Sequence, residues 1–191
     1  MILGRKRSAA VGIEAISVHI PAHYLPLEAL AERYGVDPAK YLGGLGCRRM
    51  AVTHPTQDTV TMAAAAVSDL LSRYGVSRED VGMLAVGTET GVDSSKPVAS
   101  YVHGMTGLPA SCRVLDLQHA CYGATAGLQL AASWAASDAS GGRKAIVVAS
   151  DVSRYQPGSP GAPTQGAGAV AMLVGRRPAV LAIDRSRETV H

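Results

Sequence analysis

The chain has 191 residues, a hydrophobic content of 47% and a formal net charge of +3 at pH 7. This length suits one domain or half of a larger protein, and this composition excludes a disordered chain. The charge is mild, the only contiguous basic run of three residues is 5–7, and no apolar stretch approaches the roughly 18 residues of a membrane span. Neither nucleic acid nor a membrane is therefore expected as a partner.

The cysteines indicate a reducing compartment. Cys47, Cys112 and Cys121 show neither a CxxC pair nor the spacing of metal ligands. Their odd number favours free thiols, and the N-terminus lacks the apolar run of a signal peptide. We expect a cytoplasmic protein without a bound metal.

The expected elements alternate along the chain. Residues 1–10 are expected to form a flexible tail, and 11–191 a single domain. Strands are expected at 11–20, 83–88, 113–117, 145–149, 169–174 and 179–184. Helices are expected at 27–34, 58–74, 96–105 and 121–137, and a further short one begins where Asp37 is the N-cap and Pro38 the first helical residue. A loop rich in Gly and Pro is expected at 156–168.

Alternation of strands and helices predicts an α/β sheet with crossover connections. The strands are apolar without a polar face, so helices should cover both faces of the sheet. The segments 169–174 and 179–184 are separated by a Gly-Arg-Arg-Pro turn. Their proximity predicts an antiparallel hairpin at the edge of the sheet.

The segment His119-Ala120-Cys121-Tyr122-Gly123 contains the strongest chemical signal. It joins an expected strand to an expected helix, which would make Cys121 the first or second helical residue. Free N–H groups and the helix dipole favour a thiolate there, and a thiolate is the nucleophile of acyl transfer. Glu89 ends an earlier apolar strand and is the natural acid or base. Without further context, Cys121 could equally be a core residue and Glu89 a surface carboxylate.

The expected helix at 121–137 has an unusual surface. Thr125, Gln129, Ser133 and Ser137 recur every four residues, and the segment holds no Lys, Arg, Asp or Glu. An ordinary surface helix carries more charge than this. One of its faces can rest on the sheet of this chain, so something else should cover the other.

Several motifs together resemble 3-hydroxy-3-methylglutaryl-CoA synthase, a family of the thiolase superfamily. They run in order from about residue 11 to residue 185, and are Gly12-Ile13-Glu14-Ala15-Ile16, Gly35-Val36-Asp37-Pro38-Ala39-Lys40-Tyr41, Gly44-Leu45-Gly46, Met50-Ala51-Val52, Val86-Gly87-Thr88-Glu89-Thr90, Ser95-Lys96-Pro97, Ala120-Cys121-Tyr122-Gly123, Ser150-Asp151 and Pro163-Thr164-Gln165-Gly166-Ala167-Gly168-Ala169-Val170. The resemblance implies a thiolase-like half, with a mixed five-stranded sheet covered by helices on both faces. It also implies coenzyme A thioesters as substrates and no cofactor.

The resemblance assigns roles to particular residues. Cys121 resembles the nucleophile that takes acetyl from acetyl-CoA, and Glu89 the acid/base of the condensation with acetoacetyl-CoA. Six further positions match substrate-binding ones: Asp37, Pro38 and Lys40 at the rim for the nucleotide end, and Asp151, Tyr155 and Thr164 nearer the reacting groups. Alternatives remain open, since Asp151 could orient a loop, Asp37 could cap its helix and Tyr155 could serve packing.

The family's catalytic histidine, its substrate-binding asparagine and one oxyanion-hole amide belong to a second half that this sequence does not contain. His119 is expected to pack or cap rather than replace that histidine. The sequence therefore predicts one subunit of a split synthase, a heterodimer or larger heteromer whose second polypeptide resembles the C-terminal half. Two alternatives remain: the same chemistry on carrier-protein-bound 3-ketoacyl chains, as in polyketide β-branching, and a non-catalytic acyl-CoA-binding or scaffold subunit. Glu89 disfavours a plain thiolase or ketosynthase.

Overall fold

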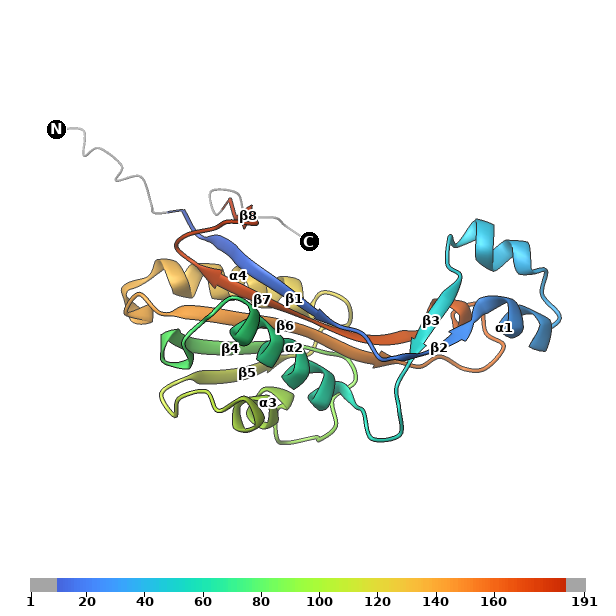
Figure 1. Cartoon of the computed structure of the whole chain (residues 1–191), viewed down its shortest axis with the longest axis horizontal. Coiled ribbons are helices and arrows are strands. Elements are labelled where there is room, and N and C mark those ends of the chain that lie inside the picture. The colour runs from blue at the N-terminus through green and yellow to red at the C-terminus, as the bar shows by residue number, and fades with distance from the viewer. Residues whose placement is uncertain (1–9, 185–191) are drawn as a thin grey trace.

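A computed structural model describes residues 10–184, so the expected tail at 1–10 lies, apart from Ala10, outside the described residues. The main sheet is mixed and has the order β5-β4-β6-β7-β1-β8 (Figure 1). Its strands are β1 (Gly12–His19), β4 (Val81–Gly87), β5 (Arg113–Leu117), β6 (Lys144–Ser153), β7 (Gly166–Gly175) and the two-residue β8 (Leu181–Ala182). β4 runs parallel to β5 and β6, whereas the pairs β6–β7, β7–β1 and β1–β8 are antiparallel.

Helices cover both faces of this sheet, as the sequence predicts. The helices are α1 (Leu27–Arg33), α2 (Thr59–Arg73), α3 (Val98–Thr106) and α4 (Gly123–Ala136). α2 and α3 pack in one buried cluster with alternate residues of β4 and β6, and α4 packs in a second cluster with the intervening residues. The mixed α/β sheet is thus confirmed, and its five long strands are joined by β8 as a sixth.

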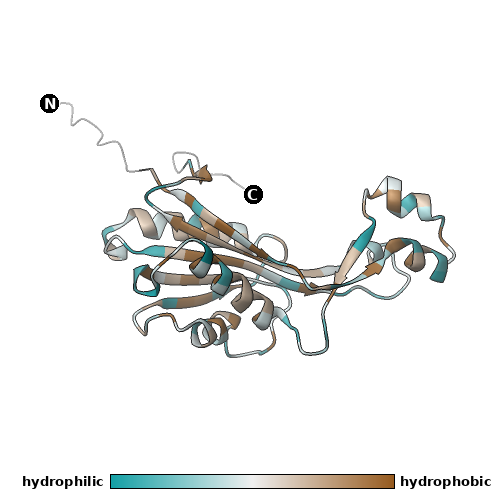
Figure 2. Ribbon diagram, in the orientation of Figure 1, coloured by the Kyte–Doolittle hydropathy of each residue, from teal (hydrophilic) through white to brown (hydrophobic). Residues whose placement is uncertain are grey.

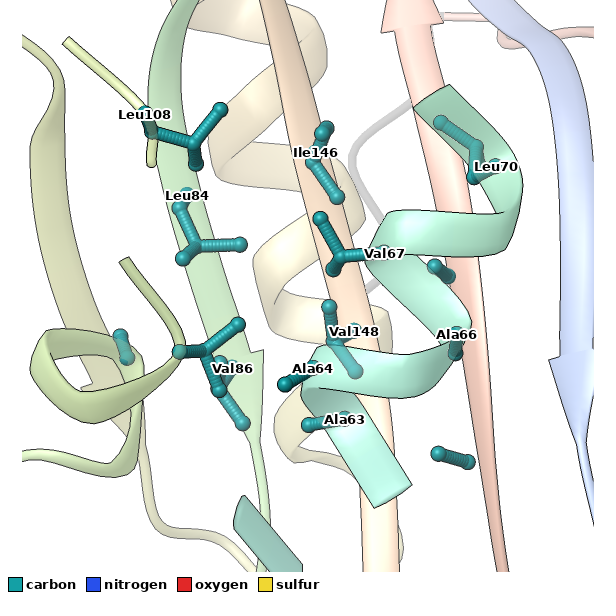
Figure 3. Close-up of a cluster of buried hydrophobic side chains, with 14 of the residues drawn as sticks. Ala63, Ala64, Ala66, Val67, Leu70, Leu84, Val86, Leu108, Ile146 and Val148 are labelled. Atoms are coloured by element: carbon teal, nitrogen blue, oxygen red, sulfur yellow. The ribbon is translucent and has the colours of Figure 1, made fainter. Parts of the chain in front are cut away.

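Small residues set the close spacing between α2 and the sheet. Ala63 and Ala64 of α2 lie over Val86 and Val148, and Figure 3 shows these short side chains between the helix and strands β4 and β6. The hydrophobic colour in Figure 2 follows the same central strands. Asp58 begins α2 with a capping box: its carboxylate accepts the N–H of Thr61 at 2.8 Å, and the Thr61 hydroxyl accepts the N–H of Asp58.

The predicted terminal hairpin is wrong, because β1 lies between β7 and β8. β1 pairs with β7 from Gly12 to His19, so the hydrogen-bonding edge of β7 is already satisfied when the chain reaches β8. β8 pairs with β1 only at Gly12 and Ile13. Gly12 allows this close approach, since a Cβ there would lie 2.8 Å from Ala182 Cα.

A second sheet has two strands, β2 (His23–Pro26) and β3 (Arg49–Val52), and the sequence pattern did not predict it. It lies with α1 at one end of the molecule (Figure 1). We call β2, α1, β3 and the π-helix η1 (Lys40–Gly44) the arm. Three short 3-10 helices complete the described elements: η2 (Arg78–Asp80), η3 (Asp138–Ser140) and η4 (Ala162–Thr164).

Candidate active site

Cys121 lies on an exposed turn between β5 and α4. The turn is closed by a hydrogen bond from the Tyr122 N–H to the His119 carbonyl at 2.9 Å, and Ala120 takes the left-handed φ of 40°. Because of this turn, α4 begins at Gly123, with Tyr122 as its N-cap. The expectation that Cys121 is the first or second helical residue is therefore wrong; it immediately precedes the N-cap.

Two glycines bring the start of α4 against the ends of two strands. A Cβ on Gly87, at the end of β4, would lie 2.6 Å from Ala124 Cα, and a Cβ on Gly123 would lie 2.5 Å from the Leu117 carbonyl oxygen of β5. Both distances are shorter than side chains adopt, so only glycine fits. This packing places the turn that carries Cys121 next to the segment that follows β4.

Glu89 lies in that segment, two residues after β4 ends, and its side chain is exposed. Its backbone N–H donates to Asp151 Oδ1 at 2.8 Å. Glu89 and Ala120, the neighbour of Cys121, line one hollow of about 650 Å³. The structure therefore brings the two predicted catalytic segments to the same hollow.

Asp151, on β6, holds the segment around Glu89 through hydrogen bonds. Its Oδ1 atom accepts hydrogen bonds from the Thr88 hydroxyl, the Glu89 N–H, the Thr90 N–H and the Thr90 hydroxyl, at 2.8, 2.8, 3.1 and 2.8 Å. These contacts correspond to the alternative in which Asp151 orients a loop. Asp151 also lines a second hollow of about 430 Å³ together with Thr164, so a substrate contact stays a prediction as well.

Tyr155 lies at a third hollow of about 360 Å³, between β3 and the ends of β6 and β7. Its N–H donates to Gln165 Oε1 at 3.0 Å, and Gln165 Nε2 lies 3.7 Å from the Met50 sulfur atom in β3. Tyr155 is 48% exposed, although Gly161 packs against its ring closely enough that a Cβ on Gly161 would lie 3.2 Å from the ring. This hollow therefore lies between the arm and the main sheet.

The three residues predicted to bind the nucleotide end, Asp37, Pro38 and Lys40, lie in the arm. Asp37 Oδ1 accepts the N–H of Ala39 at 2.9 Å, which is the capping interaction that the sequence suggested. Asp37 and Lys40 are exposed at the start of the π-helix η1, and none of the three lines the hollows described above. Their role toward a ligand stays a prediction.

His119 lines the Glu89 hollow, and its exposed ring packs edge-on against Tyr122 with 5.2 Å between the ring centroids. Asp93 lines the same hollow. The backbone N–H groups of Ser95 and Lys96 and the Tyr101 hydroxyl donate to Asp93, which lowers the pKa of that carboxyl. Asp93 is thus held as an anion that orders the segment after Glu89.

The three cysteines differ in their reactivity. Burial raises the pKa of the Cys112 thiol to about 11, so this residue stays protonated and inert at neutral pH. Cys47 and Cys121 are exposed. Between residues 10 and 184, no group of three or more His, Cys, Asp or Glu residues is arranged to hold a metal ion. Nor is any helix within that range both long and apolar enough to traverse a bilayer.

Sequence reasoning missed the threonines that surround Glu89. Thr88 and Thr90 contact Asp151, and Thr59, at the start of α2, contacts Thr90. Thr88 and Thr90, the hydroxyl residues on both sides of Glu89, were a signal in the sequence that this segment could be held by side-chain hydrogen bonds. Their partners, however, lie 31 and more than 60 positions away in the sequence.

A mixed sheet between helices, with a cysteine-bearing turn before a helix that packs on the sheet, defines a thiolase-like α/β half. Residues 7–179 match the family model "Hydroxymethylglutaryl-coenzyme A synthase N terminal", and the chain belongs to this family. It is 44% identical over 173 residues to the hydroxymethylglutaryl-CoA synthase of Enterococcus faecalis, a match that covers 91% of this chain and 44% of the relative.

A polyketide-pathway relative is also similar. The chain is 35% identical over 186 residues to the polyketide biosynthesis 3-hydroxy-3-methylglutaryl-ACP synthase PksG of Bacillus subtilis, covering 92% of this chain and 44% of that protein. The chain thus spans about two fifths of the length of these relatives.

Solved structures give the same result. MvaS in complex with 3-hydroxy-3-methylglutaryl coenzyme A superposes with a TM-score of 0.90 at 54% identity, covering 93% of this chain and 42% of that one. The HMG synthase of the curacin biosynthetic pathway in complex with acetyl donor-ACP superposes with a TM-score of 0.83 at 34% identity, covering 93% and 44%.

Proposed function

We propose that this chain is the nucleophile-bearing subunit of a 3-hydroxy-3-methylglutaryl-CoA synthase, and that a second polypeptide resembling the C-terminal half completes its site. The observation that carries the proposal is the shared hollow, where the exposed Glu89 side chain lies beside the turn that carries Cys121. The reaction needs both a nucleophile and a base, and the chain supplies both.

The chemistry assigns one group to each step. The Cys121 thiolate attacks the carbonyl carbon of acetyl-CoA, the bond from that carbon to the coenzyme A sulfur breaks, and coenzyme A leaves as its thiolate, so that acetyl-Cys121 forms. Glu89 removes a proton from the acetyl methyl group, because a thioester makes its α-protons acidic enough for a carboxylate when the enolate is stabilised. The resulting carbanion attacks the ketone carbon of acetoacetyl-CoA, Glu89 returns a proton to the alkoxide, and water hydrolyses the thioester to free Cys121.

The remaining predicted residues bind the two thioesters, with no further cofactor. Asp37, Pro38 and Lys40 are proposed to contact the nucleotide end of coenzyme A from the arm. Tyr155 and Thr164 line the hollows nearer the catalytic segments and are proposed to contact the acyl and pantetheine parts. The proposed location is the cytoplasm, where the three cysteines stay reduced.

The outer face of α4 has the properties of a surface that a second polypeptide would cover. Thr125, Gln129 and Ser133 are exposed there, Leu130 is 39% exposed, and no charged residue interrupts 121–137. An uncharged, partly apolar helix face of this kind is typical of a surface that another protein covers. The proposed partner is the C-terminal-half-like polypeptide, in a heterodimer or a larger heteromer.

A second candidate function is the same condensation on carrier-protein-bound chains. The similarity to PksG and to the curacin synthase in complex with acetyl donor-ACP favours it. Arg48 and Arg49 are exposed at the arm, and Arg154 is exposed at the mouth of the third hollow. Exposed arginines suit either the phosphates of coenzyme A or an acidic carrier protein, so the acyl donor has to be tested directly.

The test is to express the chain with and without the product of the adjacent reading frame, and to record native and denaturing mass spectra after adding acetyl-CoA or an acetylated carrier protein. A complex that carries one acetyl group on Cys121 supports the proposal, and the better donor decides between the two functions. Cys121→Ser should abolish acetylation, whereas the exposed control Cys47→Ser should not. Glu89→Gln should permit acetylation and block condensation.

A folded chain that neither associates with the second polypeptide nor becomes acetylated would refute the proposed enzymatic function and leave a binding or scaffold role. The face of α4 can be tested in the same samples. Leu130→Arg should abolish association, whereas Met105→Arg, on α3 at the opposite face of the sheet and 59% exposed, should leave it unchanged.

A further inference from the structure

Beneath Glu89, side-chain hydrogen bonds join three separate elements. The Thr90 hydroxyl lies at their centre: it donates to Asp151 Oδ1 at 2.8 Å and accepts the Val152 N–H of β6 at 3.0 Å. Thr59, the first residue of α2, donates from its hydroxyl to the Thr90 carbonyl at 2.9 Å and lies 2.9 Å from the Thr90 hydroxyl oxygen. The segment after β4 is thus tied both to β6 and to the start of α2.

The start of α2 is itself fixed from β6. The Ser150 hydroxyl donates to the Thr59 carbonyl oxygen at 2.8 Å. Thr59, Thr88 and Ser150 are 2%, 0% and 1% exposed. Water cannot replace a hydrogen bond at such buried positions, so each lost bond leaves a polar group without a partner.

Glu89 differs from these neighbours, because its side chain is exposed while its backbone N–H is held by Asp151. The chain therefore fixes the position of this carboxylate through the backbone on both sides of it. A base that removes a proton from a bound acetyl group must be held to within a fraction of an ångström. Hydroxyl groups far from the reacting atoms can provide this precision.

We propose that Thr90, supported by Thr59, is a positioning residue for Glu89. Neither hydroxyl lines the Glu89 hollow, so both act through the backbone of the Glu89 segment. The consequence is that the start of α2, about 30 residues before Glu89, takes part in placing the base. The assignment rests on the proposed function, in which Glu89 acts in condensation and not in the acetylation of Cys121.

The test compares Thr90→Val and Thr59→Val, which remove the hydroxyl at nearly constant volume, with Thr90→Ser and Thr59→Ser, which restore it. Thr106→Val is the matched control. Thr106 is 3% exposed and its hydroxyl donates to the Val102 carbonyl at 2.7 Å within α3, without a contact to the Glu89 segment. A general loss of stability would appear in the control as well.

The first measurement is amide hydrogen exchange at Glu89 in the full-length chain. Exchange at this N–H should become at least tenfold faster in Thr90→Val and about threefold faster in Thr59→Val, and should return to the original rate in both serine variants. Thr106→Val should leave it unchanged. Unchanged exchange at Glu89 in Thr90→Val, or equal acceleration in Thr106→Val, would overturn the proposal.

The second measurement separates the two steps in the assembled enzyme. Thr90→Val should acetylate Cys121 within threefold of the original rate and condense 30- to 100-fold more slowly, with serine rescuing condensation. Equal loss in both steps would contradict a positioning role. If Thr90→Val does not fold, Thr59→Val decides, since it leaves the four bonds to Asp151 in place. An unsubstituted enzyme that does not condense would refute the proposed function, while the exchange rates would still decide the role of Thr90.

Discussion

Substituting Gly87 with alanine should move the start of α4, and with it the turn that carries Cys121, away from Glu89. The added Cβ would lie 2.6 Å from both Ala124 Cα and the Gly123 carbonyl carbon. These are backbone atoms, which cannot rotate aside as a side chain would. The Ala124 nitrogen would lie closer still, so the helix start has to move by more than about 0.8 Å before every contact reaches an ordinary 3.4 Å.

Two effects of this movement can be estimated. Overpacking of a well-packed interior costs typically about 1–3 kcal/mol, and contact with rigid backbone places Gly87→Ala in the upper half of that range. Catalysis is more sensitive, because a misplacement of about 1 Å at a reacting group costs roughly 100-fold in rate. We therefore expect a loss of about 2–3 kcal/mol in the free energy of unfolding, and acetylation of Cys121 slowed by one to two orders of magnitude.

Urea unfolding measures the first effect, and intact-protein mass spectrometry after addition of acetyl-CoA measures the second. Gly104→Ala is the control, since Gly104 lies within α3 and nothing is within 4 Å of its added Cβ. Alanine there should stabilise the helix by about 0.5–1 kcal/mol. If Gly87→Ala unfolds at the same urea concentration as the unsubstituted chain and acetylates as fast, the close packing of β4 against α4 does not place the nucleophile.

Two further predictions concern protonation and helix capping. Burial raises the pKa of the Cys112 thiol from 9.0 to about 11, so iodoacetamide at pH 8 should modify Cys47 and Cys121 well before Cys112, as peptide mapping would show. Between pH 9 and 11 the unfolded thiol is more ionised than the folded one, so unfolding should become easier by at most about 3 kcal/mol, a loss that Cys112→Val should not show in urea titrations at pH 8 and 11. Asp58→Ala removes the capping box of α2 and should cost about 1 kcal/mol in the same assay, whereas Asp58→Asn should cost less than half of that.

The sequence predicted those elements whose signals are local. α2 is indicated by its apolar period and by Asp58 at its start, and β4 and β6 are indicated by continuous apolar runs that need cover on both faces. The terminal hairpin failed because strand pairing is not local. A short turn between two apolar segments does not indicate whether a strand from the other end of the chain lies between them. Here β1 pairs with β7 over most of the length of β1.

The sequence names candidate residues for the site, whose roles stay predictions, and it does not indicate their geometry. The motif around Cys121 predicts a nucleophile, but the start of α4 depends on the left-handed Ala120 and on the fit of Gly87 and Gly123, which no periodicity reveals. Asp151 was predicted as a substrate-binding or loop-orienting residue, but its four donors all come from Thr88, Glu89 and Thr90, about 60 residues earlier, which no local pattern indicates.

The proposed nucleophile Cys121 and the proposed base Glu89 are held in place by different means, so each should respond differently to a change in its surroundings. The Glu89 segment is held by hydrogen bonds that the Glu89 N–H, the Thr90 N–H and the Thr90 hydroxyl donate to Asp151, all of which lie within the chain. Cys121 is fixed by backbone packing at Gly87 and by an exposed turn, one side of which this chain leaves open. Hydrogen bonds that share one acceptor atom are lost together when that acceptor is lost, whereas an exposed turn adjusts when another surface covers it. Binding of the proposed second polypeptide should therefore change the reactivity of Cys121 far more than the position of Glu89.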